Sequence, residues 1–72
     1  MTKANIEAGN IVTYFQLMNG VSTKEAIKIS LMYVRKQIKK NKDVSFNLAL
    51  KRELKFKLKM QNKLKTLLSQ IK

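Results

Sequence analysis

The sequence contains no cysteine, no histidine, no tryptophan and no proline, and only two glycines. Without cysteine and histidine, neither disulfides nor the commonest zinc sites can form. The four acidic residues are scattered along the chain, so no general acid–base pair and no metal-binding cluster is expected. Neither glycine belongs to a phosphate-binding motif. We therefore expect a binding or assembly protein that is not an enzyme and that uses no metal and no cofactor.

The chain is also short, and it lacks long apolar runs. Its 72 residues are enough for one small domain, whose modest core is marginally stable without disulfides, a metal or oligomerisation. Since the first two are excluded, we expect a homodimer. No apolar run approaches the length of a membrane span, and the first ten residues lack the apolar core of a signal peptide. We expect an intracellular protein with no membrane partner.

Positive charge is concentrated in the second half of the chain. The formal net charge is +12. Residues 1–34 contain three basic and two acidic residues, whereas residues 35–72 contain thirteen basic and two acidic residues. Such an asymmetry predicts an acidic partner, either nucleic acid, an anionic membrane or an acidic protein surface.

Apolar spacing in the first half predicts two helices joined by a short turn. The first helix is expected to end at Gly20, and "STKE" (Ser22 to Glu25) is a capping box that starts the second. We predict an all-α fold in which residues 1–42 form an antiparallel helical hairpin that is the dimerisation body. Its apolar residues exceed the needs of one hairpin, which indicates a core shared between two chains. The predicted dimer interface consists of Ile11, Phe15, Met18, Ile27, Leu31, Val34 and Ile38.

The third segment contains an ambiguous stretch, "ELKFKLKM" (Glu53 to Met60). From Leu54 onward it alternates apolar residues with lysine, which is typical of a half-buried strand. However, residues 46–65 lack β-branched residues and are rich in good helix formers. No partner strand or hairpin turn is nearby, and a lone strand is not stable in water. We therefore predict a helix, capped by Asp43 or Ser45, in which Leu54 and Phe56 lie on opposite sides and the buried face changes over.

Residues 43–72 are predicted to form a basic amphipathic helix that binds a partner. Its second half repeats apolar residues at helical spacing, at Met60, Leu64, Leu67 and Ile71. Basic amphipathic helices lie on membranes, enter grooves or dock on acidic proteins. Nucleic acid is the alternative partner, because "NGVSTKEAI" (Asn19 to Ile27) resembles the turn of helix-turn-helix proteins. Only two of the sixteen basic residues are arginine, which favours phosphate contacts over base-specific contacts.

The ending "KLKTLLSQIK", together with the length and the Lys/Asn/Ile-rich, cysteine-free composition, resembles the capsid-morphogenesis internal scaffolding proteins of Staphylococcus aureus pathogenicity islands. The resemblance extends over the whole chain in size, composition and layout. It implies an α-helical dimer that binds a phage major capsid protein and redirects assembly to a smaller capsid, in the bacterial cytoplasm and inside the procapsid. A small basic nucleic-acid-binding regulator of a phage or mobile element is the alternative. The implied capsid-protein contacts are Lys59, Leu64, Lys65, Leu67, Leu68, Ile71 and Lys72.

Overall fold

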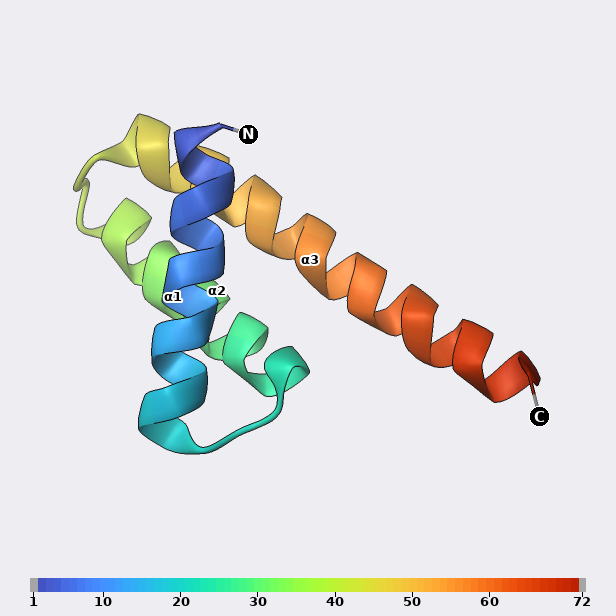
Figure 1. Cartoon of the computed structure of the whole chain (residues 1–72). Coiled ribbons are helices and arrows are strands. Elements are labelled where there is room, and N and C mark those ends of the chain that lie inside the picture. Colours follow the sequence, from blue (N-terminus) through green and yellow to red (C-terminus); the bar gives the residue numbers. More distant parts are fainter. Residues whose placement is uncertain (1, 72) are drawn as a thin grey trace.

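Three helices make up the computed structural model of this protein, which describes residues 2–71 and the side chains of residues 2–70. Helix α1 spans Lys3–Asn19, α2 spans Thr23–Lys39 and α3 spans Val44–Ile71 (Figure 1). Within the described residues there is no strand. The all-α prediction is therefore confirmed, and so is the helical interpretation of residues 53–60.

The ends of α1 and α2 are fixed by local hydrogen bonds that the sequence predicted in part. Gly20 adopts the left-handed conformation, at φ 58°, and its N–H donates to the Gln16 carbonyl at 2.9 Å. This is the conformation that glycine accepts most readily after a helix. The Ser22 hydroxyl oxygen then accepts from the Glu25 N–H at 3.3 Å and caps α2. The predicted helix stop and the predicted serine cap are both confirmed.

All three pairs of helices are in contact, and one apolar core lies between them. Its largest fully buried apolar side chains are Ile27 and Val34 of α2 and Leu54 of α3. Small residues allow the helices to approach closely, and the buried Ser30 hydroxyl donates to the Ala26 carbonyl of its own helix at 2.7 Å. The core comprises Ala4, Ala8, Val12, Ala26, Ile27, Leu31, Val34, Leu50 and Leu54.

The loop between α2 and α3 is held by a buried asparagine. Asn47 is 7% exposed, and its side-chain amide donates to the Lys42 carbonyl at 2.8 Å and to the Asp43 carbonyl at 3.2 Å. Asp43 occupies the position before α3, with its carbonyl accepting the Asn47 N–H at 2.9 Å. Ser45, the other predicted cap, lies inside the helix. The loop residues Asn41 and Asp43 both have positive φ, at 60° and 40°.

Helix α3 continues beyond the core that the three helices share. Its 28 residues correspond to about 42 Å, close to the longest dimension of the molecule, which measures 46 × 24 × 21 Å. The buried side chains of α3 all belong to its first half, and every described side chain from residue 62 to residue 70 is exposed. Figure 1 shows this second half projecting away from α1 and α2. A long, largely uncovered helix is thus attached to a small helical body.

Candidate partner-binding surfaces

The alternating stretch of α3 divides its apolar residues between two sides of one helix. Leu54 is 0% exposed and belongs to the core, and Leu58 packs partly against it. Phe56 and Met60 are 59% and 46% exposed. At about 100° per residue, Phe56 lies roughly on the opposite side of the helix from Leu54. The alternation of residues 54–60 therefore marks the place where the apolar side of α3 turns from the core towards solvent.

A continuous apolar edge follows from this change of face. Phe56 is succeeded by Met60, Leu64 and Leu67 at spacings of four, four and three residues, and all four side chains are exposed. At these spacings they line up along one side of the helix over roughly 17 Å. We call these four residues the apolar edge of α3. Exposed apolar residues in a row, unlike scattered ones, mark interaction surfaces.

Six of the seven basic residues that the structure describes in α3 lie on two different sides of the helix. Arg52, Lys55, Lys59 and Lys63 are exposed and recur every three or four residues, so they form a stripe that faces away from the core. We call this set the outer basic stripe. Lys57 and Lys65 lie instead on the side that faces the rest of the molecule, where each lines a cavity. The two groups of positive charge can therefore serve different partners.

An open groove of about 430 Å³ lies between α1 and α3. One wall is a row of small and polar residues on α1, and the other carries the exposed side chains of Phe56 and Met60. The Asn5 amide donates to Glu53 Oε1 at 2.8 Å, which ties the two helices together beside the groove. The groove is lined by Asn5, Gly9, Val12, Thr13, Gln16, Thr23, Ile27, Phe56, Lys57, Met60 and Gln61.

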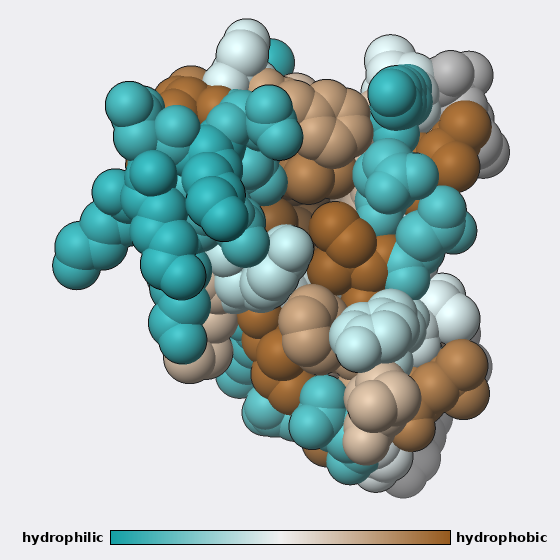
Figure 2. All heavy atoms as spheres, turned by 90° about the vertical axis from the view of Figure 1, so that its left-hand side faces the viewer, coloured by the Kyte–Doolittle hydropathy of each residue, from teal (hydrophilic) through white to brown (hydrophobic). Residues whose placement is uncertain are grey.

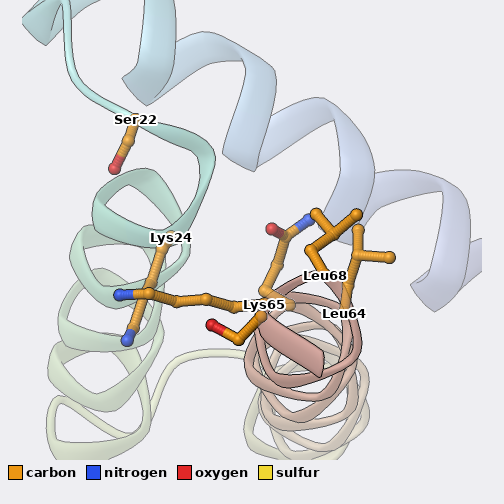
Figure 3. A pocket seen from close by; sticks show the side chains of 7 residues that line it. Ser22, Lys24, Leu64, Lys65 and Leu68 are labelled. Carbon is orange, nitrogen blue, oxygen red and sulfur yellow. The ribbon is translucent and has the colours of Figure 1, made fainter. Parts of the chain in front are cut away.

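A second open cavity, of about 510 Å³, adjoins the first and shares Gln61 with it. It lies between the start of α2 and the second half of α3 (Figure 3). Figure 3 shows Lys65 reaching from α3 towards the first turn of α2, from which Lys24 projects. Leu64 and Leu68 contribute apolar surface on the α3 side. We call the two adjoining cavities together the α1–α3 groove.

An aromatic surface covers the opposite side of α1. The Phe15 ring lies 5.3 Å from the Tyr14 ring and 5.9 Å from the Tyr33 ring, measured between ring centroids. Together with Asn10 and Ile11 these residues line an open hollow of about 540 Å³. Figure 2 views the molecule from the side of the α2–α3 loop and shows apolar surface in a hollow between hydrophilic borders. We call Ile11, Tyr14, Phe15 and Tyr33 the aromatic face.

The residues predicted to form a dimer interface fall into three groups in a single chain. Ile27, Leu31 and Val34 are buried in the core of one chain. A second group packs partly against that core, and Met18 is 67% exposed. The second group consists of Ile11, Phe15 and Ile38. The surface that this set offers to a second chain therefore lies at Met18 and at the partly buried positions, while dimerisation itself stays a prediction.

The residues that the resemblance implies for capsid-protein binding lie on the projecting half of α3. Those with described side chains are all exposed, and Leu64, Lys65 and Leu68 line the α1–α3 groove. Lys72 and the side chain of Ile71 lie outside the described residues. The exposed members are Lys59, Leu64, Lys65, Leu67 and Leu68.

Sequence reasoning missed the α1 wall of the groove and the aromatic contribution of Tyr33. The available signal was Gly9, since an isolated glycine within a helical pattern costs stability and points to a packing or functional reason. Nothing lies within 4 Å of the position where a Cβ of residue 9 would sit. The glycine therefore opens surface rather than relieving a close contact between helices.

Comparison of this chain with protein-family models, with curated proteins and with solved structures finds no match. Across residues 2–71, no group of three or more histidine, cysteine, aspartate or glutamate side chains is arranged to hold a metal ion. None of the described helices combines the length and the apolar character that crossing a membrane requires.

Proposed function

We propose that this protein is an internal scaffolding protein that binds a phage major capsid protein and redirects assembly to a smaller capsid. Its role is binding and not catalysis. The observation that carries the proposal is the projecting half of α3, where an uncovered apolar edge lies between two sets of basic residues. The resemblance to the scaffolding proteins suggests which protein is the partner. The positive charge of α3 indicates that the surface it binds on that partner is acidic.

Weak contacts made many times suit a scaffold that must later leave the shell. A short amphipathic helix buries little surface, and its lysine contacts weaken as salt increases. Dimerisation and the repetition of capsid subunits multiply such contacts into an effective avidity. The scaffold can then hold subunits during assembly and dissociate once they rearrange.

We also propose that the chain is a homodimer built on the antiparallel pair formed by α1 and α2. The support is the aromatic face, which together with Met18 leaves large apolar side chains exposed on this pair of helices. Aromatic residues and methionine are enriched in protein interfaces. The aromatic face and the apolar edge of α3 lie on different parts of the molecule, so one chain can bind its copy and its capsid partner together.

The dimer is tested by charging the aromatic face without disturbing the core. Tyr14 and Tyr33 are exposed, so the double variant Tyr14→Lys/Tyr33→Lys should fold and should sediment as a monomer at concentrations where the wild-type protein is a dimer. Ile27→Lys or Val34→Asp would instead unfold the chain, because both positions are buried. A wild-type protein that is monomeric at tens of micromolar would contradict the dimer.

The scaffold is tested by co-expressing the chain with a phage major capsid protein and measuring shell diameters by electron microscopy. The double variant Leu64→Glu/Leu67→Glu charges the apolar edge at exposed positions, so it should fold, and it should lose both capsid-protein binding and the small shells. The matched control Asn62→Glu/Thr66→Glu introduces the same two glutamates at exposed positions of the same half of α3 that lie outside the implied contact set, and it should keep both the binding and the small shells. Small shells formed as efficiently by the apolar-edge variant would refute the role of α3.

Nucleic-acid binding is the second candidate, and the outer basic stripe is the observation that favours it. Its four exposed basic side chains run along one side of α3, where they can make non-specific phosphate contacts. The binding constant for duplex DNA should then fall steeply as salt rises, and Lys59→Glu/Lys63→Glu should weaken it strongly. Tight, sequence-selective binding at physiological salt would place this function ahead of scaffolding.

A further inference from the structure

The α1–α3 groove has the shape and the lining of a receptor for a helix. It follows α3 from Phe56 to Ser69, a length of about 20 Å or roughly 14 residues of helix. One lip is formed by exposed apolar side chains of α3. The opposite wall is formed by small and polar residues of α1 beside the first cavity and by Ser22 and Lys24 at the start of α2 beside the second. Amphipathic helices commonly bind in grooves of this kind through side chains spaced three or four residues apart.

The charge on the groove indicates what kind of helix it takes. Of the described residues that line the two cavities, three are lysines and none is acidic. Lys57 lies at one end, and Lys24 and Lys65 lie on the two sides of the other end. Glu53, the nearby acid on α3, is hydrogen-bonded to Asn5. Acidic side chains flanking an apolar stripe would therefore meet positive charge along the groove.

We propose that the α1–α3 groove binds an acidic amphipathic helix of the partner protein, with the apolar side of that helix between α1 and the apolar edge and its carboxylates near Lys24, Lys57 and Lys65. This proposal rests on the proposed scaffold function, whose partner it specifies as a helical segment. In this arrangement the partner is recognised by residues of α1 as well as by residues of α3.

Charge argues against a second copy of this chain as the occupant. The longest amphipathic helix that a second copy could offer is α3, whose described part contains seven lysines and arginines from residue 51 onward against the single acid Glu53. Placing it in a groove lined by three lysines would bring like charges together. The first helix of a copy has no comparable penalty, so self-association through the groove is tested below.

Gly9 leaves space for the bound helix in the α1–α3 groove. Its φ is not in the left-handed region, and a Cβ added to residue 9 would meet nothing within 4 Å, so neither the backbone nor the core requires glycine there. What its missing side chain provides is depth in the groove, because residue 9 lines the wall opposite Phe56 and Met60. A side chain of the bound helix can occupy that space.

The first experiment uses a synthetic amphipathic helix as the probe. The peptide has about 14 residues, with leucines at helical spacing on one side and glutamates beside them, and its counterpart has lysines in place of the glutamates. Fluorescence anisotropy of the labelled peptides should show saturable binding of the acidic peptide and at least about tenfold weaker binding of the basic one. Failure of the acidic peptide to bind the full-length protein would overturn the proposal.

The second experiment places the same change of charge on two sides of α3. Lys57→Glu/Lys65→Glu reverses charge in the groove and should weaken binding of the acidic peptide by about tenfold. Lys55→Glu/Lys63→Glu makes the same change of net charge on the outer basic stripe and should weaken it by no more than about twofold. Equal losses from the two variants would show that total charge, and not the groove, attracts the peptide, as expected for a nucleic-acid-binding surface.

The third experiment fills the groove without changing its charge. Gly9→Leu should abolish peptide binding, whereas Gly9→Ala, whose Cβ meets no neighbour, should retain more than about half of the affinity. Ser45→Leu, at an exposed position of α3 outside the groove and the aromatic face, is the matched control and should bind as the wild type does. Circular dichroism checks that each variant is folded. If Gly9→Leu is unfolded, the comparison of Lys57→Glu/Lys65→Glu with Lys55→Glu/Lys63→Glu tests the groove in its place. A shift from dimer to monomer in Gly9→Leu would identify a second copy as the occupant and refute the proposal.

The capsid protein itself separates failure of this inference from failure of the proposed function. If wild-type protein binds the acidic peptide but no phage capsid protein, the groove stands and the scaffold function fails. If capsid-protein binding is lost in Leu64→Glu/Leu67→Glu but unaffected by Gly9→Leu and Lys57→Glu/Lys65→Glu, the scaffold function stands and the groove is not its receptor.

Discussion

Leu54 and Phe56, two apolar residues of the alternating stretch, should respond very differently to truncation. Leu54→Ala removes a side chain that is 0% exposed and packed among residues of all three helices. Buried leucine-to-alanine changes typically cost about 2.7–5 kcal/mol, so we expect a loss of about 3 kcal/mol in the free energy of unfolding. The protein as a whole is expected to have only about 4–11 kcal/mol, so this single change removes a large part of its stability.

Phe56→Ala removes more atoms and should cost less. Its side chain is 59% exposed, so less than half of the roughly 1.5–3 kcal/mol for burying such a residue is at stake, which is about 1 kcal/mol. For a domain of this size each kcal/mol corresponds to about 4–8 °C in Tm. We therefore expect Leu54→Ala to melt about 8–16 °C below Phe56→Ala.

The assay is thermal unfolding followed by circular dichroism, with both variants at one fixed protein concentration because a dimer melts in a concentration-dependent way. Chemical unfolding gives the same comparison independently of temperature. If truncation of Phe56 were as costly as truncation of Leu54, Phe56 would be buried in solution. The change of face along α3 would then be wrong.

The remaining stability predictions use the same unfolding assays. Gly9→Ala should stabilise by about 0.5–1 kcal/mol, because alanine suits a helix interior better and its Cβ meets nothing. Gly20→Ala should destabilise by about 1 kcal/mol, since residue 20 has φ 58°. Ser22→Ala should cost about 1 kcal/mol by removing the cap of α2. Asn47→Ala should cost about 1–3 kcal/mol, because the Lys42 carbonyl loses its side-chain donor and the Asp43 carbonyl keeps only the backbone N–H of residue 47. A change of opposite sign in either glycine variant, or no change in either polar variant, would contradict the role given to that residue.

Local chemistry made the three helices predictable from sequence. Gly20 and the serine cap at residue 22 are short-range signals whose partners lie within four residues, so they do not depend on the tertiary fold. The absence of β-branched residues from 46 to 65 likewise decided between strand and helix without tertiary information. Ile27, Leu31, Val34 and Ile38 recur every three or four residues, and the first three are buried while Ile38 packs against the core; their role in a dimer interface stays a prediction.

What covers each apolar face could not be read from spacing. The same periodicity describes the buried α2 residues and the exposed apolar edge, because a helix alone does not show whether a face meets its own chain or a partner. The hydrogen bond between Asn5 and Glu53 spans 48 positions, and the groove beside it exists only once α1 and α3 are placed together. Asn47 was missed for the same reason, since a buried asparagine is recognisable only by the carbonyls that surround it.

The division of α3 into a packed and a projecting half links stability to recognition. Its first half supplies Leu50 and Leu54 to the core, and the second half supplies exposed apolar and basic side chains. Because the helix is continuous, the core fixes where the apolar edge points relative to α1, which reduces the entropy lost when a partner helix binds. The same continuity means that destabilising the core should weaken binding only by lowering the fraction of folded protein that presents this orientation. Leu54→Ala should thus affect binding only in proportion to the fraction unfolded, whereas Gly9→Leu should abolish it in a protein that remains folded.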